Sequence, residues 1–78
     1  MRSANVSGAR IKQAREERGL DQVDLAVALS ADHKIKIDQS DISEIERGIR
    51  GVKDYELDAI AQVLNVGVLW LLRGAKDE

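Results

Sequence analysis

A short segment in the middle of the chain, residues 38–48, constrains the fold most, because strong helix start and stop residues bracket it. Asp38 is a good N-cap, since its carboxylate can accept from the free amides of a first helical turn. Gly48 is a good stop, because glycine enters the left-handed conformation at little cost. Ile42 and Ile45 share one side. The other side carries hydrogen-bonding residues: Gln39, Ser40, Ser43 and Glu44. The segment predicts a short helix with an apolar back and a polar front.

Comparable signals, apolar spacings of three and four, and the absence of Pro divide the chain into five short helices. We expect Ser7, Asp21 and Asp54 to cap the first, second and fourth of them. The expected helices cover residues 8–18, 22–29, 39–47, 55–64 and 68–73, with Gly19, Gly48, Asn65 and Gly74 as stops. The sequence therefore predicts an all-α fold, a compact bundle of five helices.

The connection between the second and third helices, residues 30–38, is ambiguous. Its first residues could prolong the second helix, whereas the alternation over residues 34–37 is typical of a strand. Because a lone short strand has no partner here, we expect an extended turn with Ile35 or Ile37 tucked inward.

Composition argues against several classes of protein. The 78 residues suffice for one small domain, and the absence of Cys excludes disulfides and thiolate metal sites. A single His, His33, cannot build a multi-histidine site, so neither a metal nor a cofactor is expected. No apolar run is long enough for a membrane span and no signal-peptide pattern is present, which favours a cytoplasmic protein. No nucleophile–base set indicates an enzyme. The net charge of −2 does not indicate nucleic-acid binding, so that role has to rest on local arrangement.

The order of motifs over residues 8–74 resembles the Cro/repressor (XRE-type) helix-turn-helix domain. The matching segments are RIKQAR at 10–15, GLDQVDLA at 19–26, ISEIERG at 42–48, DYEL at 54–57, IAQVL at 60–64 and VGVLWLL at 66–72. The resemblance implies a lambda-repressor-like bundle in which the second and third helices form the helix-turn-helix. It also implies double-stranded operator DNA as the partner.

The resemblance assigns roles to individual residues. Gln22 matches a residue that meets a DNA phosphate together with the start of its helix. Positions that reach bases or phosphates from the recognition helix are matched by Gln39, Ser40, Ser43 and Glu44, the last where the family often has Gln, Arg or Lys. Backbone-contacting cations are matched by Arg47, Arg50 and Lys53, with Lys34 and Lys36 as further candidates. Arg15 and Glu46 match a structural ion pair between the first and third helices.

The polar face alone would favour an ordinary solvated helix surface, and the ordered resemblance reverses that preference. The resulting hypothesis is a sequence-specific transcriptional regulator, a repressor, acting as a homodimer. Leu69, at a position usually polar in the family, and Trp70 are the expected dimer contact. Two alternatives stay open: an antitoxin that represses its own operon, and a module that binds a protein partner and not DNA. Residues 1–7 are expected to be a flexible arm and residues 75–78 a tail.

Overall fold

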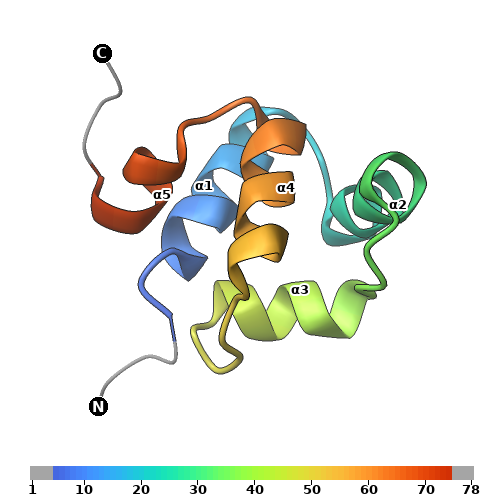
Figure 1. Ribbon diagram of the computed structural model, residues 1–78, viewed down its shortest axis with the longest axis horizontal. Helices are drawn as coiled ribbons and strands as arrows, with labels where there is room; N and C mark the ends of the chain where they lie inside the picture. Colours follow the sequence, from blue (N-terminus) through green and yellow to red (C-terminus); the bar gives the residue numbers. More distant parts are fainter. Residues whose placement is uncertain (1–4, 75–78) are drawn as a thin grey trace.

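The computed structural model describes residues 5–74 and contains five α-helices within that range (Figure 1). They are α1 (Gly8–Glu17), α2 (Gln22–His33), α3 (Gln39–Glu46), α4 (Asp54–Leu64) and α5 (Val68–Arg73). The all-α fold class is confirmed. In Figure 1, α3 crosses below α1 and α4, while α2 and α5 flank them on opposite sides. Residues 1–4 and the expected tail at 75–78 lie outside the described residues.

Reciprocal capping explains where α2 and α3 begin. The carboxylate of Asp21 accepts from the backbone N–H of Asp24 at 2.8 Å, and the Asp24 carboxylate accepts from the N–H of Asp21 at 2.9 Å. Asp38 and Asp41 form the same pair at the start of α3, at 2.9 and 3.1 Å. Each pair satisfies two N–H groups that a helix start leaves without an intrahelical partner.

The start of α4 differs from the expectation by one residue. Asp54 is already helical, and the N-cap is Lys53, whose N–H donates to the Glu56 carboxylate at 3.0 Å. Asp54, expected as the N-cap, is therefore the first helical residue instead, although its carboxylate accepts from the N–H of Tyr55 at 2.7 Å. A carboxylate three residues into the helix satisfies the N–H of the cap residue, which is one half of a capping box.

Ser7 occupies the N-cap position of α1 as expected, but its hydroxyl forms no capping bond, and the start of α1 is fastened by Asn5 instead. The Asn5 Oδ1 accepts from the N–H groups of Ser7 and Gly8 at 3.1 and 2.6 Å. Its Nδ2 donates to the carbonyls of Ile45 and Arg50 at 3.1 and 2.7 Å. One amide thus joins the start of α1 to the end of α3 and the loop after it. Residues 5–7 are anchored here, unlike the arm expected for residues 1–7.

The connection between α2 and α3 is shorter than expected. α2 continues well past Leu29, which leaves only residues 34–38 between the helices. Lys34 ends α2 in the left-handed conformation, with a φ of 56°, and the N–H of Ile35 donates back to the Leu29 carbonyl at 3.1 Å. Ile37 is buried and Ile35 half-buried, so the expected inward turn is confirmed.

All five helices contribute to one apolar core. Its largest fully buried members are Ile11, Leu25, Leu29, Ile42, Ile45, Ile60, Leu64 and Leu71. α1 and α3 approach so closely that position 8 requires glycine, because a Cβ there would collide with the Ile45 carbonyl oxygen. This contact and the buried Ile42 and Ile45 fix which side of α3 faces outward. In the described part of the chain, no helix has the length and apolar character needed to cross a membrane.

Candidate nucleic-acid interface

A polar groove of about 390 Å³ lies where the start of α2 meets α3. Its lining residues all belong to the candidates identified in the sequence: Gln22, Gln39, Ser40, Ser43, Glu44 and Arg47. Along α3 and its C-cap Arg47, positions 40, 43, 44 and 47 share one face because they are three or four residues apart. The fully buried Ile42 and Ile45 hold the opposite face in the core. The polar front of α3 is therefore presented outward by the packing of its apolar back.

A chain of hydrogen bonds connects the core to this groove. The Arg15 guanidinium donates to both Glu46 oxygens, Nε to Oε2 at 2.6 Å and Nη2 to Oε1 at 3.0 Å, so the ion pair expected between α1 and α3 is present and bidentate. Glu46 Oε1 also accepts from Gln22 Nε2 at 3.1 Å, and Gln22 Oε1 accepts from Gln39 Nε2 at 3.4 Å. The Gln22 amide is thereby oriented, with its nitrogen toward the core and its oxygen toward α3.

The charge state of the pair follows from the same bonds. Hydrogen bonding to Glu46 raises the pKa of Arg15 above its ordinary value, although burial acts in the opposite direction. The side chains of Arg15 and Glu46 are only 9% and 2% exposed. Two opposite charges at such burial are mutually dependent, because removing one would leave the other without compensation.

Most carboxylates of α3 and its cap have structural partners. Asp38 and Asp41 hold the backbone amides of the first turn, and Glu46 pairs with Arg15. Glu44 differs: it is half-buried and lines the groove, and among the described residues its carboxylate forms neither a salt bridge nor a side-chain hydrogen bond. Most carboxylates of α3 and its cap are therefore paired within the domain, whereas the Glu44 carboxylate faces the groove.

Arg50, expected among the backbone-contacting cations, is engaged inside the domain. Its Nη1 and Nη2 donate to the two oxygens of Glu56 at 3.1 and 3.0 Å, and its Nε lies 3.7 Å from Asp41 Oδ1. Glu56 is only 3% exposed. The bonds from Arg50 hold the pKa of Glu56 below its ordinary value, against the opposing effect of burial, and the same bonds raise the pKa of Arg50. Sequence reasoning missed this pair because Arg50 lies in an irregular loop whose path no periodicity defines.

The other candidate cations are exposed: Lys34, Lys36, Arg47 and Lys53. Of these, Arg47 lines the groove, whereas Lys34 and Lys36 lie on the connection between α2 and α3. The Lys53 Nζ lies 5.9 Å from the centre of the Tyr55 ring, within the range of a cation–π contact. The structure thus gathers part of the predicted set around one groove and leaves four predicted cations outside it, Arg50 included.

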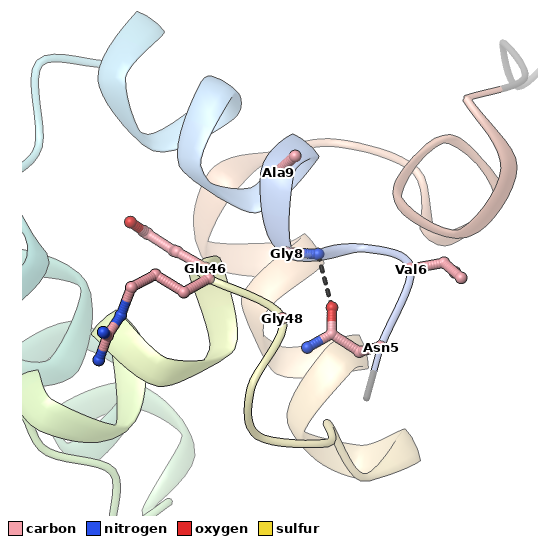
Figure 2. A pocket seen from close by; sticks show the side chains of 7 residues that line it. Asn5, Val6, Gly8, Ala9, Glu46 and Gly48 are labelled. Atoms are coloured by element: carbon pink, nitrogen blue, oxygen red, sulfur yellow. Dashed lines mark hydrogen bonds between the residues drawn. The ribbon is translucent and has the colours of Figure 1, made fainter. Parts of the chain in front are cut away.

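A second hollow, of about 620 Å³, lies between the start of α1 and the end of α3 (Figure 2). Its lining residues are Asn5, Val6, Gly8, Ala9, Glu46, Arg47 and Gly48. In Figure 2 the Asn5 amide is directed toward Gly8, and Val6 points away into solvent. The sequence carried no signal for Asn5, because its partners Ile45 and Arg50 lie 40 and 45 residues away along the chain.

Comparison with models of protein families identifies the family of this chain. The model of the Helix-turn-helix family matches residues 11–71. The chain belongs to this helix-turn-helix family. The membership confirms the XRE-type resemblance, and the family is one of DNA-binding transcription regulators. α2 and α3 are the helix-turn-helix itself, so the groove lined by Gln22 and Gln39 lies on that unit.

A solved structure has the same helix-turn-helix fold. It is the P22 c2 repressor protein, crystallised in complex with synthetic operator 9T in the presence of Tl⁺. The two structures have a TM-score of 0.77 and 22% sequence identity, over 91% of this chain and 98% of that chain. At this identity the likeness establishes the fold, and the expected lambda-repressor-like bundle is confirmed. No curated protein matches the chain.

The last helix of this helix-turn-helix domain carries a small apolar surface. Leu69 is 51% exposed and Leu72 is 38% exposed, and they lie three residues apart on α5. Trp70 instead packs half-buried against the core. Of the pair expected to form a dimer contact, Leu69 is therefore the exposed member, and Leu72, which the sequence did not single out, is exposed on the same helix.

Proposed function

We propose that this helix-turn-helix protein is a transcriptional repressor that binds operator DNA as a homodimer. α3 enters the major groove, which is wide enough for a helix and presents a different donor and acceptor pattern for each base pair. One observation carries the proposal: six polar side chains of α2 and α3 converge on one groove while the apolar back of α3 is locked in the core. The fold shared with a repressor solved on its operator supports it.

The side chains divide into two kinds of contact. Bases and neighbouring phosphates are read by Gln39, Ser40, Ser43 and Glu44. The DNA backbone is positioned by Gln22, Lys34, Lys36, Arg47 and Lys53. Arg50 has a different role, because its guanidinium is held by Glu56 and Asp41; it fixes the loop from which Arg47 and Lys53 project. This division separates groups that carry sequence information from groups that set register.

The negative net charge sets the expected affinity. Because the net charge of −2 gives no overall attraction to DNA, we expect weak nonspecific binding, so a single domain needs a second copy to hold an operator firmly. Leu69 and Leu72 form the contact between the two copies. In such dimers the two recognition helices lie roughly 34–36 Å apart, about one turn of DNA. This role places the protein in the cytoplasm, at the nucleoid.

Selection from a random duplex DNA pool tests the proposal. The enriched sequence is then titrated against scrambled DNA at two salt concentrations. We expect a palindrome bound at least ~10³-fold more tightly than scrambled DNA. A matched variant, Leu69→Ser, should weaken binding to the palindrome while leaving the stability of the monomer close to that of the wild type, because Leu69 is half-exposed.

If no sequence is enriched and binding is negligible at low salt, the proposal fails and a protein partner becomes the better hypothesis. An antitoxin would show both operator binding and a stable complex with a toxin, which size-exclusion chromatography of the two co-expressed proteins would detect.

A further inference from the structure

Glu44 is chemically unlike the other residues of the groove. Gln22, Gln39, Ser40 and Ser43 can both donate and accept hydrogen bonds, whereas an ionised carboxylate can only accept. Glu44 stands on the same face of α3 as Ser40 and Arg47, within the groove that the proposed function brings to DNA. Its backbone carbonyl accepts from the N–H groups of Ile49 and Arg50, at 2.9 and 3.3 Å, which fixes this turn of the helix.

Neither neighbouring arginine hydrogen-bonds to the Glu44 carboxylate. The charge of Glu44 is one of those that raise the pKa of Arg50, but the hydrogen bonds of the Arg50 guanidinium go to Glu56 and Gly51. Arg47 directs its Nε to the Ser43 carbonyl at 3.4 Å. A half-buried acceptor with no donor in the described part of the chain has its hydrogen-bonding capacity open toward the groove.

The major groove limits what such an acceptor can meet. Guanine presents N7 and O6, and thymine presents O4, all acceptors that repel a carboxylate. The available donors are the amino groups of adenine and cytosine. Adenine places its N7 acceptor beside the amino group, whereas cytosine presents N4–H₂ with no acceptor of its own at that edge. A carboxylate therefore favours cytosine.

We propose that Glu44 is a specificity-determining residue of this domain and selects a cytosine in each half-site of the operator. The inference rests on the proposed function and narrows it to one base. Glu44 acts partly by exclusion, because a wrong base leaves its charge desolvated against an acceptor. The same charge lowers affinity for arbitrary DNA, since it lies near phosphates without pairing to them.

The test compares the wild type with Glu44→Gln on the duplex selected above and on its variants at every position. For the wild type, replacing the cytosine by guanine at one position of the half-site weakens binding roughly 5- to 150-fold. Glu44→Gln lowers this ratio to about 3-fold or less, because Gln can both donate and accept, and it tightens binding to scrambled DNA. Glu17→Gln, an equal charge change on the exposed side of α1, leaves both quantities unchanged.

Three results would overturn the inference. The first is a Glu44→Gln profile that matches the wild type at every position. The second is a selected half-site without a cytosine that responds to the substitution. In both cases operator binding by the wild type stays intact, so the proposed function survives. The third is no enriched sequence for the wild type, in which case the proposed function fails and the inference with it. Glu44→Ala serves as a second variant, and it also removes the cytosine preference.

Discussion

Two bidentate arginine–glutamate pairs support α3 and the loop that follows it, and they differ in the further contacts that each pair makes. Arg15–Glu46 joins α1 to the end of α3, and Glu46 extends outward through Gln22 to the groove. Arg50–Glu56 joins the loop after α3 to α4. The first pair is buried at both ends, with side-chain exposures of 9% and 2%, whereas the arginine of the second pair is 26% exposed.

The difference separates two ways of supporting a binding surface. Through Glu46, the first pair orients an amide of the surface itself, so stability and recognition share one carboxylate. The second pair shapes only the loop: the Arg50 carbonyl accepts from Asn5, and the Arg50 side chain bonds Glu56. A cation in the loop beside α3 is thus not automatically available for contacts outside the domain.

The largest effect is expected from Glu46→Ala. It leaves Arg15 charged and buried without its carboxylate, which costs about 3–5 kcal/mol of the free energy of unfolding. Urea denaturation followed by circular dichroism measures the loss. Glu17→Ala, on an exposed position of α1, is the matched control and should change stability by no more than about 0.5 kcal/mol. A loss below about 1 kcal/mol for Glu46→Ala would mean that the pair is effectively solvated. Glu46→Gln provides a milder variant if the alanine variant does not fold.

A smaller loss is expected from Arg50→Ala. Glu56 then keeps only the N–H of Lys53, but water can reach the vacated position because Arg50 is partly exposed. We expect a loss of about 1.5–3 kcal/mol, the usual range for hydrogen bonds to a charged group. Its matched control is Arg47→Ala in the same loop, which should leave the urea midpoint nearly unchanged. Equal losses for the two variants would remove the distinction between a structural and a free cation.

The second pair also predicts an acid dependence. Because Arg50 holds the pKa of Glu56 below its ordinary value of 4.5, the unfolded chain binds more protons than the folded one between the two pKa values. The stability from this group is complete above about pH 4.5 and is lost as the pH falls through the folded pKa. Urea midpoints of the wild type and Glu56→Gln between pH 2.5 and 6 measure this. The two curves should converge on acidification; a constant separation would contradict the prediction.

The sequence predicted several features that local interactions control, although not the caps of α1 and α4. The capping residues Asp21 and Asp38, the apolar back at Ile42 and Ile45, and the left-handed stop at Asn65 act within a few residues, so the helices could be predicted. The family resemblance placed Arg15 opposite Glu46. The other contacts that the sequence did not predict are long-range ones that depend on an irregular loop.

Two of the contacts that the sequence did not predict share one cause. The Asn5 amide and the Arg50–Glu56 pair both depend on how the loop after α3 returns to the bundle, and no spacing in the sequence encodes that path. For the same reason the sequence did not predict that Arg50 is held by Glu56 in the free domain, since chemistry alone does not distinguish a cation held by a buried carboxylate from a free one.

The smallest effect on stability, and the clearest one on binding, is expected from Arg47→Ala. Arg47 is exposed and lines the groove, and its Nε donates to the Ser43 carbonyl within the same helical turn. Its loss should change the free energy of unfolding by no more than about 0.5 kcal/mol. Arg47→Ala should weaken binding to operator and scrambled duplexes alike and lower the slope of log K against log salt by about one.

Arg50→Ala, measured at a temperature where the variant stays folded, should keep the wild-type slope, because the charge of Arg50 is already held by Glu56. If the slopes of the two variants change places, Arg50 leaves Glu56 for phosphate on binding, and the second pair is then a feature of the free domain alone.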